Sequence, residues 1–77
     1  MEVIYDSRHY WIFSYPAQQG FELFDKTRLR TAFLQGALAW RFRLAMEGIP
    51  AARRSQESVD ALLDGYCDEF ARPIVFH

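Results

Sequence analysis

The fold is decided by residues 20–48, GFELFDKTRLRTAFLQGALAWRFRLAMEG, because the apolar residues of this stretch change their spacing partway along. They first alternate with polar residues, as in a strand, and later recur every three or four positions, as in a helix. The sequence therefore predicts a strand followed by a helix, with the change near Leu34 to Gly36.

The segment Asp25–Phe33 fits two secondary structures. Drawn as a helix, it puts Arg30 on the apolar side and Leu29 at the polar edge, which is poor amphipathicity. Drawn as a strand, it sorts its side chains onto two faces without that conflict. We therefore predict a second hairpin with a strand at about residues 29–34, and the alternative is a helix that brings Arg30 to the buried side.

Further strands are predicted at about residues 2–5, 10–15, 21–25 and 74–76, where Val, Ile, Tyr, Trp and Phe are frequent. Successive side chains of a strand point to opposite faces, so Trp11, Phe13 and Tyr15 share one face of the second strand. The opposite face is apolar too. Helices on one side of this sheet would leave a row of rings in water, and such a patch is typical of an interface.

The first helix is predicted at about residues 36–47. Its apolar side is expected to carry Phe33, Ala37, Trp40 and Leu44, flanked by Leu34, Leu38, Phe42 and Ala45. Its solvent side is expected to carry Gln35, Ala39, Arg43 and Glu47. Arg41 falls inside the apolar arc, where an unpaired arginine is rarely buried. Either its stem covers apolar surface and its guanidinium reaches the rim, or it pairs across a subunit interface or binds an anionic ligand.

The second helix is predicted at about residues 56–70 and begins at Ser55, a favourable capping residue. Its expected seam against the first helix contains Val59, Leu62, Leu63, Tyr66 and Phe70. Asp60, Asp64 and Asp68 recur every four residues, and we expect them to form a solvated stripe that faces nearby arginines. The short connection makes the two helices an antiparallel pair.

The chain of 77 residues predicts a single domain, residues 1–77, of the α+β class: a small antiparallel sheet of three to five short strands packed against two antiparallel helices. The formal net charge is −1, which lacks the basic surplus of most nucleic-acid binders. No apolar run approaches the roughly 20 residues that span a bilayer. The single cysteine and the lack of a signal peptide favour the cytoplasm.

No motif for catalysis, for a cofactor or for a metal stands out. His9, His77 and Cys67 would have to converge with a fourth ligand to hold zinc. Cys67 is expected to be a small core or flanking residue instead. We therefore expect no enzyme activity, no cofactor and no metal site.

The chain resembles a family of short bacterial proteins, found mainly in beta-proteobacteria and classed as a domain of unknown function. The resemblance covers nearly the full length and rests on IYDS at residues 4–7, GFELFDK at residues 20–26, FLQG at residues 33–36 and PIVFH at residues 73–77. It implies no established activity and no catalytic residues. Related chains carry a longer loop before the segment that begins at Gly20.

Two functions follow as hypotheses. The first is a non-catalytic protein–protein interaction or regulatory module that acts as a homodimer, with binding residues Trp11, Phe13, Tyr15, Trp40, Arg41 and Arg43. The alternative is a nucleic-acid-binding regulator that uses the arginines of the first helix and of the following loop, and such binding would weaken with added salt. The partner under the first hypothesis is a second copy or another protein, and no membrane is involved.

Overall fold

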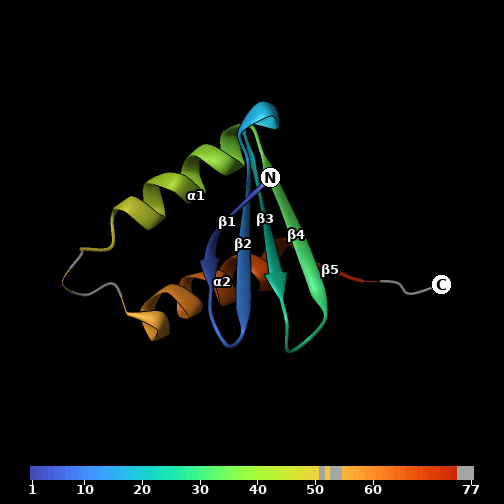
Figure 1. Cartoon of the computed structure of the whole chain (residues 1–77), viewed down its shortest axis with the longest axis vertical. Coiled ribbons are helices and arrows are strands. Elements are labelled where there is room, and N and C mark those ends of the chain that lie inside the picture. The colour runs from blue at the N-terminus through green and yellow to red at the C-terminus, as the bar shows by residue number, and fades with distance from the viewer. Residues whose placement is uncertain (51, 53–54, 75–77) are drawn as a thin grey trace.

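The computed structural model describes residues 1–50, 52 and 55–74. Figure 1 shows a sheet with both helices on one side of it. The elements are β1 (Glu2–Asp6), β2 (Tyr10–Tyr15), the short 3-10 helix η1 (Pro16–Gln18), β3 (Gly20–Asp25), β4 (Arg30–Gln35), α1 (Ala37–Glu47), α2 (Gln56–Phe70) and β5 (Arg72–Pro73). The predicted α+β class, a small antiparallel sheet packed against two helices, is confirmed.

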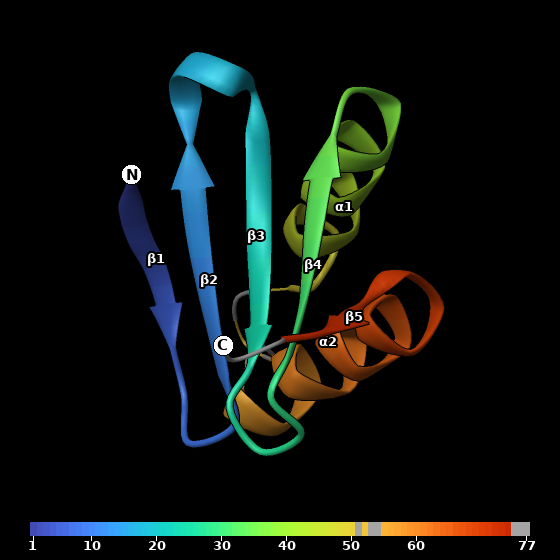
Figure 2. The ribbon, with the colours of Figure 1, turned by 90° about the vertical axis from the view of Figure 1, so that its right-hand side faces the viewer.

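The strands form one antiparallel sheet in the order β1-β2-β3-β4-β5, so each strand of the β1–β4 meander pairs with its neighbour in sequence. Figure 2 looks onto the face of this sheet that lies away from the helices. In the register of the central pairs, Ile12 lies opposite Leu23, and Leu23 lies opposite Ala32. These three side chains point toward the helices and form the sheet side of the core together with Tyr10 and Leu34.

The contested segment is strand β4 rather than a helix. Asp25 fixes the preceding turn, because its carboxylate accepts hydrogen bonds from the backbone N–H groups of Thr27 and Arg28, both at 3.0 Å. The chain changes from strand to helix at Gly36, as the spacing of apolar residues predicted. Gly36 has φ +67°, a conformation that glycine adopts without steric cost.

Strand β5 lies just before the strand predicted at residues 74–76, of which only Ile74 is among the described residues. Arg72 and Pro73 pair with Thr31 and Arg30 of β4, whereas the sequence placed this strand at residues 74–76. Ile74 lies outside the strand, and its backbone N–H donates to the carbonyl of Leu29 at 3.0 Å. Residues 75 and 76 lie outside the described residues.

The predicted buried side of α1 is wrong at its centre and right only at its flank, where Phe42 was placed. Ala39 and Phe42 are its buried residues, although Ala39 was placed on the solvent side. Trp40 and Leu44, placed in the core, are 59% and 48% exposed. Apolar residues occupy both sides of this helix, so their spacing alone does not fix which side faces the sheet. The side of α1 that faces the core is set by Phe42. Its ring contacts Phe21 of β3 and Tyr66 of α2, with ring centroids 5.4 and 5.1 Å apart.

The predicted buried side of α2 is right for Val59 and Leu63, but it faces the sheet rather than the first helix. α2 packs on β4 and β3, and meets α1 through the ring pair Phe42–Tyr66. Val59, Leu63 and Cys67 are buried, while Phe70 lies at the exposed end of the predicted seam. The helix begins at Ser55, whose hydroxyl accepts from the N–H of Ser58, and the Ser58 hydroxyl bonds back to Ser55 in a capping box. The cap provides hydrogen-bond partners for backbone N–H groups at the start of α2. At the start of α1, Gly36 has no side chain that could do the same.

Candidate interaction surface

The sheet face opposite the helices is lined with apolar side chains and forms the candidate site. No helix of the described residues covers this face, as Figures 1 and 2 show. We call it the aromatic sheet face, and define it by the side chains of Val3, Trp11, Phe13, Tyr15, Phe24 and Phe33. Their positions follow from the pairing register, because residues directly opposite in neighbouring strands point to the same face.

The aromatic rings of this face touch one another in two groups. Trp11 contacts Phe13 and Phe24, with ring centroids 5.9 and 5.3 Å apart. Tyr15 contacts Phe33, with centroids 5.7 Å apart. These are tilted arrangements within the range that favours aromatic pairs. Phe33 nevertheless remains 50% exposed, so the rings form a preassembled surface rather than a closed core.

The charged side chains among the rings have partners within the chain. Glu22 accepts hydrogen bonds from the hydroxyls of Tyr15 at 2.8 Å and Thr31 at 3.1 Å, and the bond to Glu22 raises the pKa of Tyr15. Lys26 forms an ion pair with Asp6 at 2.6 Å and lies 4.2 Å from the centre of the Trp11 ring. When this face is covered, Lys26 therefore keeps its counter-charge and the Glu22 carboxylate keeps two hydroxyl donors.

The structure divides the predicted binding residues between two surfaces. Trp11, Phe13 and Tyr15 lie together on the aromatic sheet face. Trp40, Arg41 and Arg43 lie on α1, on the other side of the sheet. The sequence also missed Phe33 as a member of the aromatic sheet face, because Phe33 was assigned to the buried side of the first helix. The alternation of Thr31 and Phe33 along a strand was the signal that could have found it.

Arg41 is exposed and lies outside the apolar contact of α1. Among the described residues it makes no ion pair, whereas Arg43 pairs with Glu47 one turn further along, at 3.3 Å. The placement of Arg41 within an apolar arc was therefore wrong, for the same reason that the phase of α1 was wrong. Arg53 and Arg54, the loop arginines of the nucleic-acid hypothesis, lie outside the described residues.

The aspartates of α2 bind the strands and the adjoining turn, although Asp64 and Asp68 remain exposed to solvent as predicted. Asp60 accepts from the hydroxyls of Tyr5 and Ser7, both at 2.9 Å, and Asp64 accepts from the hydroxyl of Tyr10. Burial and the bond to Asp60 raise the pKa of Tyr5 to about 12, and burial and Asp64 raise that of Tyr10 as well. Among the described residues, the expected pairing of this row with arginines is found at Asp68.

Arg30 joins the sheet, the turn and α2. Its Nε donates to Asp25 and its Nη2 to Asp68, both at 2.9 Å, and Arg28 approaches Asp68 at 3.6 Å. Burial opposes ionisation of Asp25, but the backbone N–H of Arg28 and the Arg30 guanidinium outweigh it, so the pKa of Asp25 is lowered. These contacts hold α2 on the sheet.

Cys67 lies in the core, as predicted, and burial raises the pKa of its thiol to about 11. A thiol in that state is a weak nucleophile at neutral pH. Within residues 1–50, 52 and 55–74, no group of three or more His, Cys, Asp and Glu side chains is arranged to hold a metal ion. No helix in the described part of the chain is long and apolar enough to cross a membrane.

Comparison with known proteins identifies relatives but no activity. The chain is 32% identical to Protein BTH_I0359 of Burkholderia thailandensis, and the alignment covers the whole of both chains. The alignment has 85 positions, so that relative carries residues absent here. No solved structure matches the chain. A family profile described as a protein of unknown function matches residues 1–77, and the chain therefore belongs to the DUF3567 family.

Proposed function

We propose that this protein is a non-catalytic protein–protein interaction or regulatory module that acts in the cytoplasm as a homodimer, in which two copies meet through the aromatic sheet face. One observation carries the proposal: five aromatic rings and Val3 lie on a sheet face that neither helix covers. Contiguous exposed apolar patches on small domains mark interaction surfaces. Two antiparallel sheets also pack well face to face, because their inner side chains interdigitate.

A second copy is the partner that fits this face. Lys26 and Asp6 already neutralise each other, and Glu22 already has two hydroxyl donors, so the face does not require a partner of opposite charge. It also lacks the basic surplus that a nucleic acid would require. A standard interface takes about 800 Å² from each partner, which is roughly 15% of the 5400 Å² accessible surface of this chain.

The molecular mass in solution tests the proposal. At tens of micromolar, sedimentation equilibrium is expected to give twice the 9.1 kDa of one chain. Phe13→Lys puts a charge in the middle of the aromatic sheet face and is expected to give 9.1 kDa with an unchanged far-ultraviolet circular dichroism spectrum. Leu44→Lys places the same charge on the exposed side of α1 and is the matched control, which should remain a dimer.

Two results would overturn this proposal. One is a wild-type mass of a single chain at that concentration. The other is a dimer that survives Phe13→Lys but dissociates with Leu44→Lys, since that would place the interface on α1. Added salt should leave the dimer intact, because its contacts are apolar rather than ionic.

A further inference from the structure

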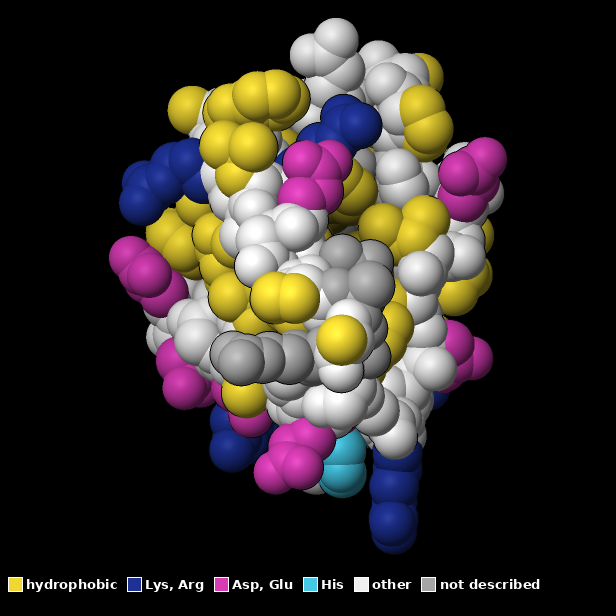
Figure 3. Space-filling view, turned by 90° about the vertical axis from the view of Figure 1, so that its left-hand side faces the viewer, with side chains coloured by type: hydrophobic (Ala, Val, Ile, Leu, Met, Phe, Trp, Pro, Cys, Tyr) yellow, Lys and Arg dark blue, Asp and Glu magenta, His cyan; other side chains and the backbone are white. Residues whose placement is uncertain are grey.

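A groove separates α1 from the N-terminal half of the sheet. α1 packs against β4 and meets β3 through the ring pair Phe21–Phe42, and a groove remains between the helix and β1, β2 and η1. The groove has a volume of about 710 Å³, within the range of roughly 300–1,000 Å³ typical of small-molecule sites. Figure 3, which faces the side of the helices, shows exposed hydrophobic side chains interrupted by neighbouring basic and acidic groups.

The inside of the groove is apolar. Phe21 and Phe42 form its floor, Met46 extends it along α1, and Ile4 closes it from β1. Ile4 is 49% exposed, although its side chain lies on the helix side, where a β-bulge displaces it from the pairing register. An apolar body placed between these side chains would remove them from water, which favours binding.

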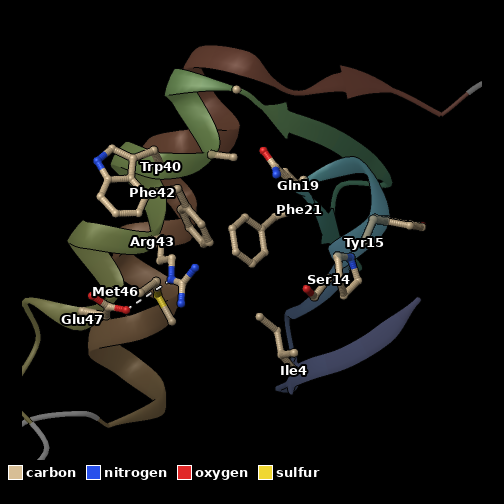
Figure 4. Close-up of a pocket in the computed structure, with 14 residues that line it drawn as sticks. Ile4, Ser14, Tyr15, Gln19, Phe21, Trp40, Phe42, Arg43, Met46 and Glu47 are labelled. Atoms are coloured by element: carbon tan, nitrogen blue, oxygen red, sulfur yellow. Dashed lines mark hydrogen bonds and ion pairs between the residues drawn. The ribbon is translucent and has the colours of Figure 1, made fainter.

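Two charged side chains of α1, Arg43 and Glu47, line this apolar space. Arg43 lines the groove and donates to Glu47 through Nε alone, at 3.3 Å. Figure 4 shows the two terminal nitrogens of its guanidinium directed away from Glu47, toward the space between α1 and the strands. In the described residues, Glu47 is the only side chain with which Arg43 forms an ion pair or hydrogen bond.

The free edge of the Arg43 guanidinium fixes the ligand chemistry. Two terminal N–H groups in one plane match the two oxygens of a carboxylate. Arg43 and Glu47 are both more than half exposed, and exposed pairs of this kind are weak, so the guanidinium can turn toward a ligand at little cost. Ser14 and Gln19 line the groove across from the helix and offer further polar contacts.

We propose that this groove binds an amphipathic monocarboxylate, with its apolar body between Phe21, Phe42 and Met46 and its carboxylate on the terminal nitrogens of Arg43. The lining from Trp40 to Glu47 covers about 10 Å of helix, which suits a medium-length alkyl chain or an aryl group. This site is on the opposite side of the sheet from the aromatic sheet face, so it does not depend on the dimer.

Decanoate and its neutral analogue decanamide test the site. Titration followed by calorimetry is expected to show saturable binding of one decanoate per chain. Arg43→Gln should weaken decanoate binding at least about tenfold and leave decanamide binding unchanged, because only the carboxylate uses the guanidinium. Arg41→Gln removes the same charge from the exposed side of the same helix and should leave both affinities unchanged.

A second variant locates the apolar body. Met46→Asp puts a charge against that body and should weaken decanoate and decanamide alike, while Phe13→Lys, on the aromatic sheet face, should weaken neither. No saturable binding of decanoate by the wild type would overturn the proposal. So would equal losses in Arg43→Gln and Arg41→Gln, which would indicate attraction to general positive charge. Binding by a monomeric Phe13→Lys protein would support the groove even if the dimer fails.

Discussion

The two helices lie on the same face of the sheet, but they are attached to it differently. α2 buries Val59, Leu63 and Cys67, begins with a capping box, and binds the strands through Asp60, Asp64 and Asp68. α1 buries only Ala39 and Phe42 and begins without a side-chain cap. α2 therefore completes the core, whereas α1 leaves apolar surface available on both of its sides.

This difference separates stability from binding. A cavity beside a helix that is fixed by buried side chains and by hydrogen bonds would lower the free energy of unfolding by a large amount. α1 packs mainly on β4. Its groove and the exposed Trp40 therefore lower the free energy of unfolding only a little. We therefore expect substitutions in α2 to change the free energy of unfolding, and substitutions in α1 to change what the protein binds.

The largest effect is expected from the apolar contacts of the two helices. Leu63→Ala, at a fully buried position of α2, should lower the free energy of unfolding by about 3 kcal/mol. Leu44→Ala makes the same change at a position of α1 that is 48% exposed, and should cost less than about 0.5 kcal/mol. Urea denaturation of both variants measures the difference. Equal losses would mean that the outer side of α1 is buried in solution, and the contrast between the helices would be lost.

The charged contacts should give the next largest difference. Arg30→Met removes the ion-pair partner of Asp25, which is 2% exposed, and should cost about 2 kcal/mol because a buried carboxylate loses its counter-charge. Arg43→Met removes the exposed pair with Glu47, which is worth no more than about 0.5 kcal/mol. Denaturant titrations at neutral pH compare the two. If Arg30→Met were harmless, Arg30 would not hold α2 on the sheet.

The smallest effect is expected from pH. The pKa of Asp25 in the folded protein lies below its ordinary value of 3.8, so its ionised form stabilises the fold. This contribution is present above that ordinary, unfolded-state pKa and is lost as the pH falls through the lowered pKa of the folded protein. The free energy of unfolding should therefore decrease below about pH 4. Asp25→Asn should be less stable at neutral pH but should lose less on acidification, and an unchanged pH profile would contradict this account.

The strand faces were predictable because alternation along a strand does not depend on the rest of the fold. Trp11, Phe13 and Tyr15 share a face in the structure, as their spacing of two residues required. The capped start of α2 and its buried Val59 and Leu63 were predictable for a similar reason, since a polar cap and one apolar stripe leave little ambiguity.

The phase of α1 and the groove were not predictable. Leu38, Ala39 and Trp40 are consecutive and all apolar, so the side that meets the sheet depends on which residue reaches Phe21 and Tyr66. The groove depends on how α1 leaves the sheet after Gly36, and Arg43 acquires its place only through that geometry. No spacing of residue types along the chain encodes the distance between a helix and strands distant in sequence.

The order β1-β2-β3-β4-β5 also determines how the chain can assemble. Neighbouring long strands are joined by turns of only a few residues, and short loops of this kind close rapidly. The meander can therefore form before the helices dock on it. The contact between Tyr5 and Asp60 spans 55 residues, so α2 attaches through the most distant part of the sequence. Until it does, Tyr10 and Ile12 face water, and that interval is when newly made chains are most prone to aggregate.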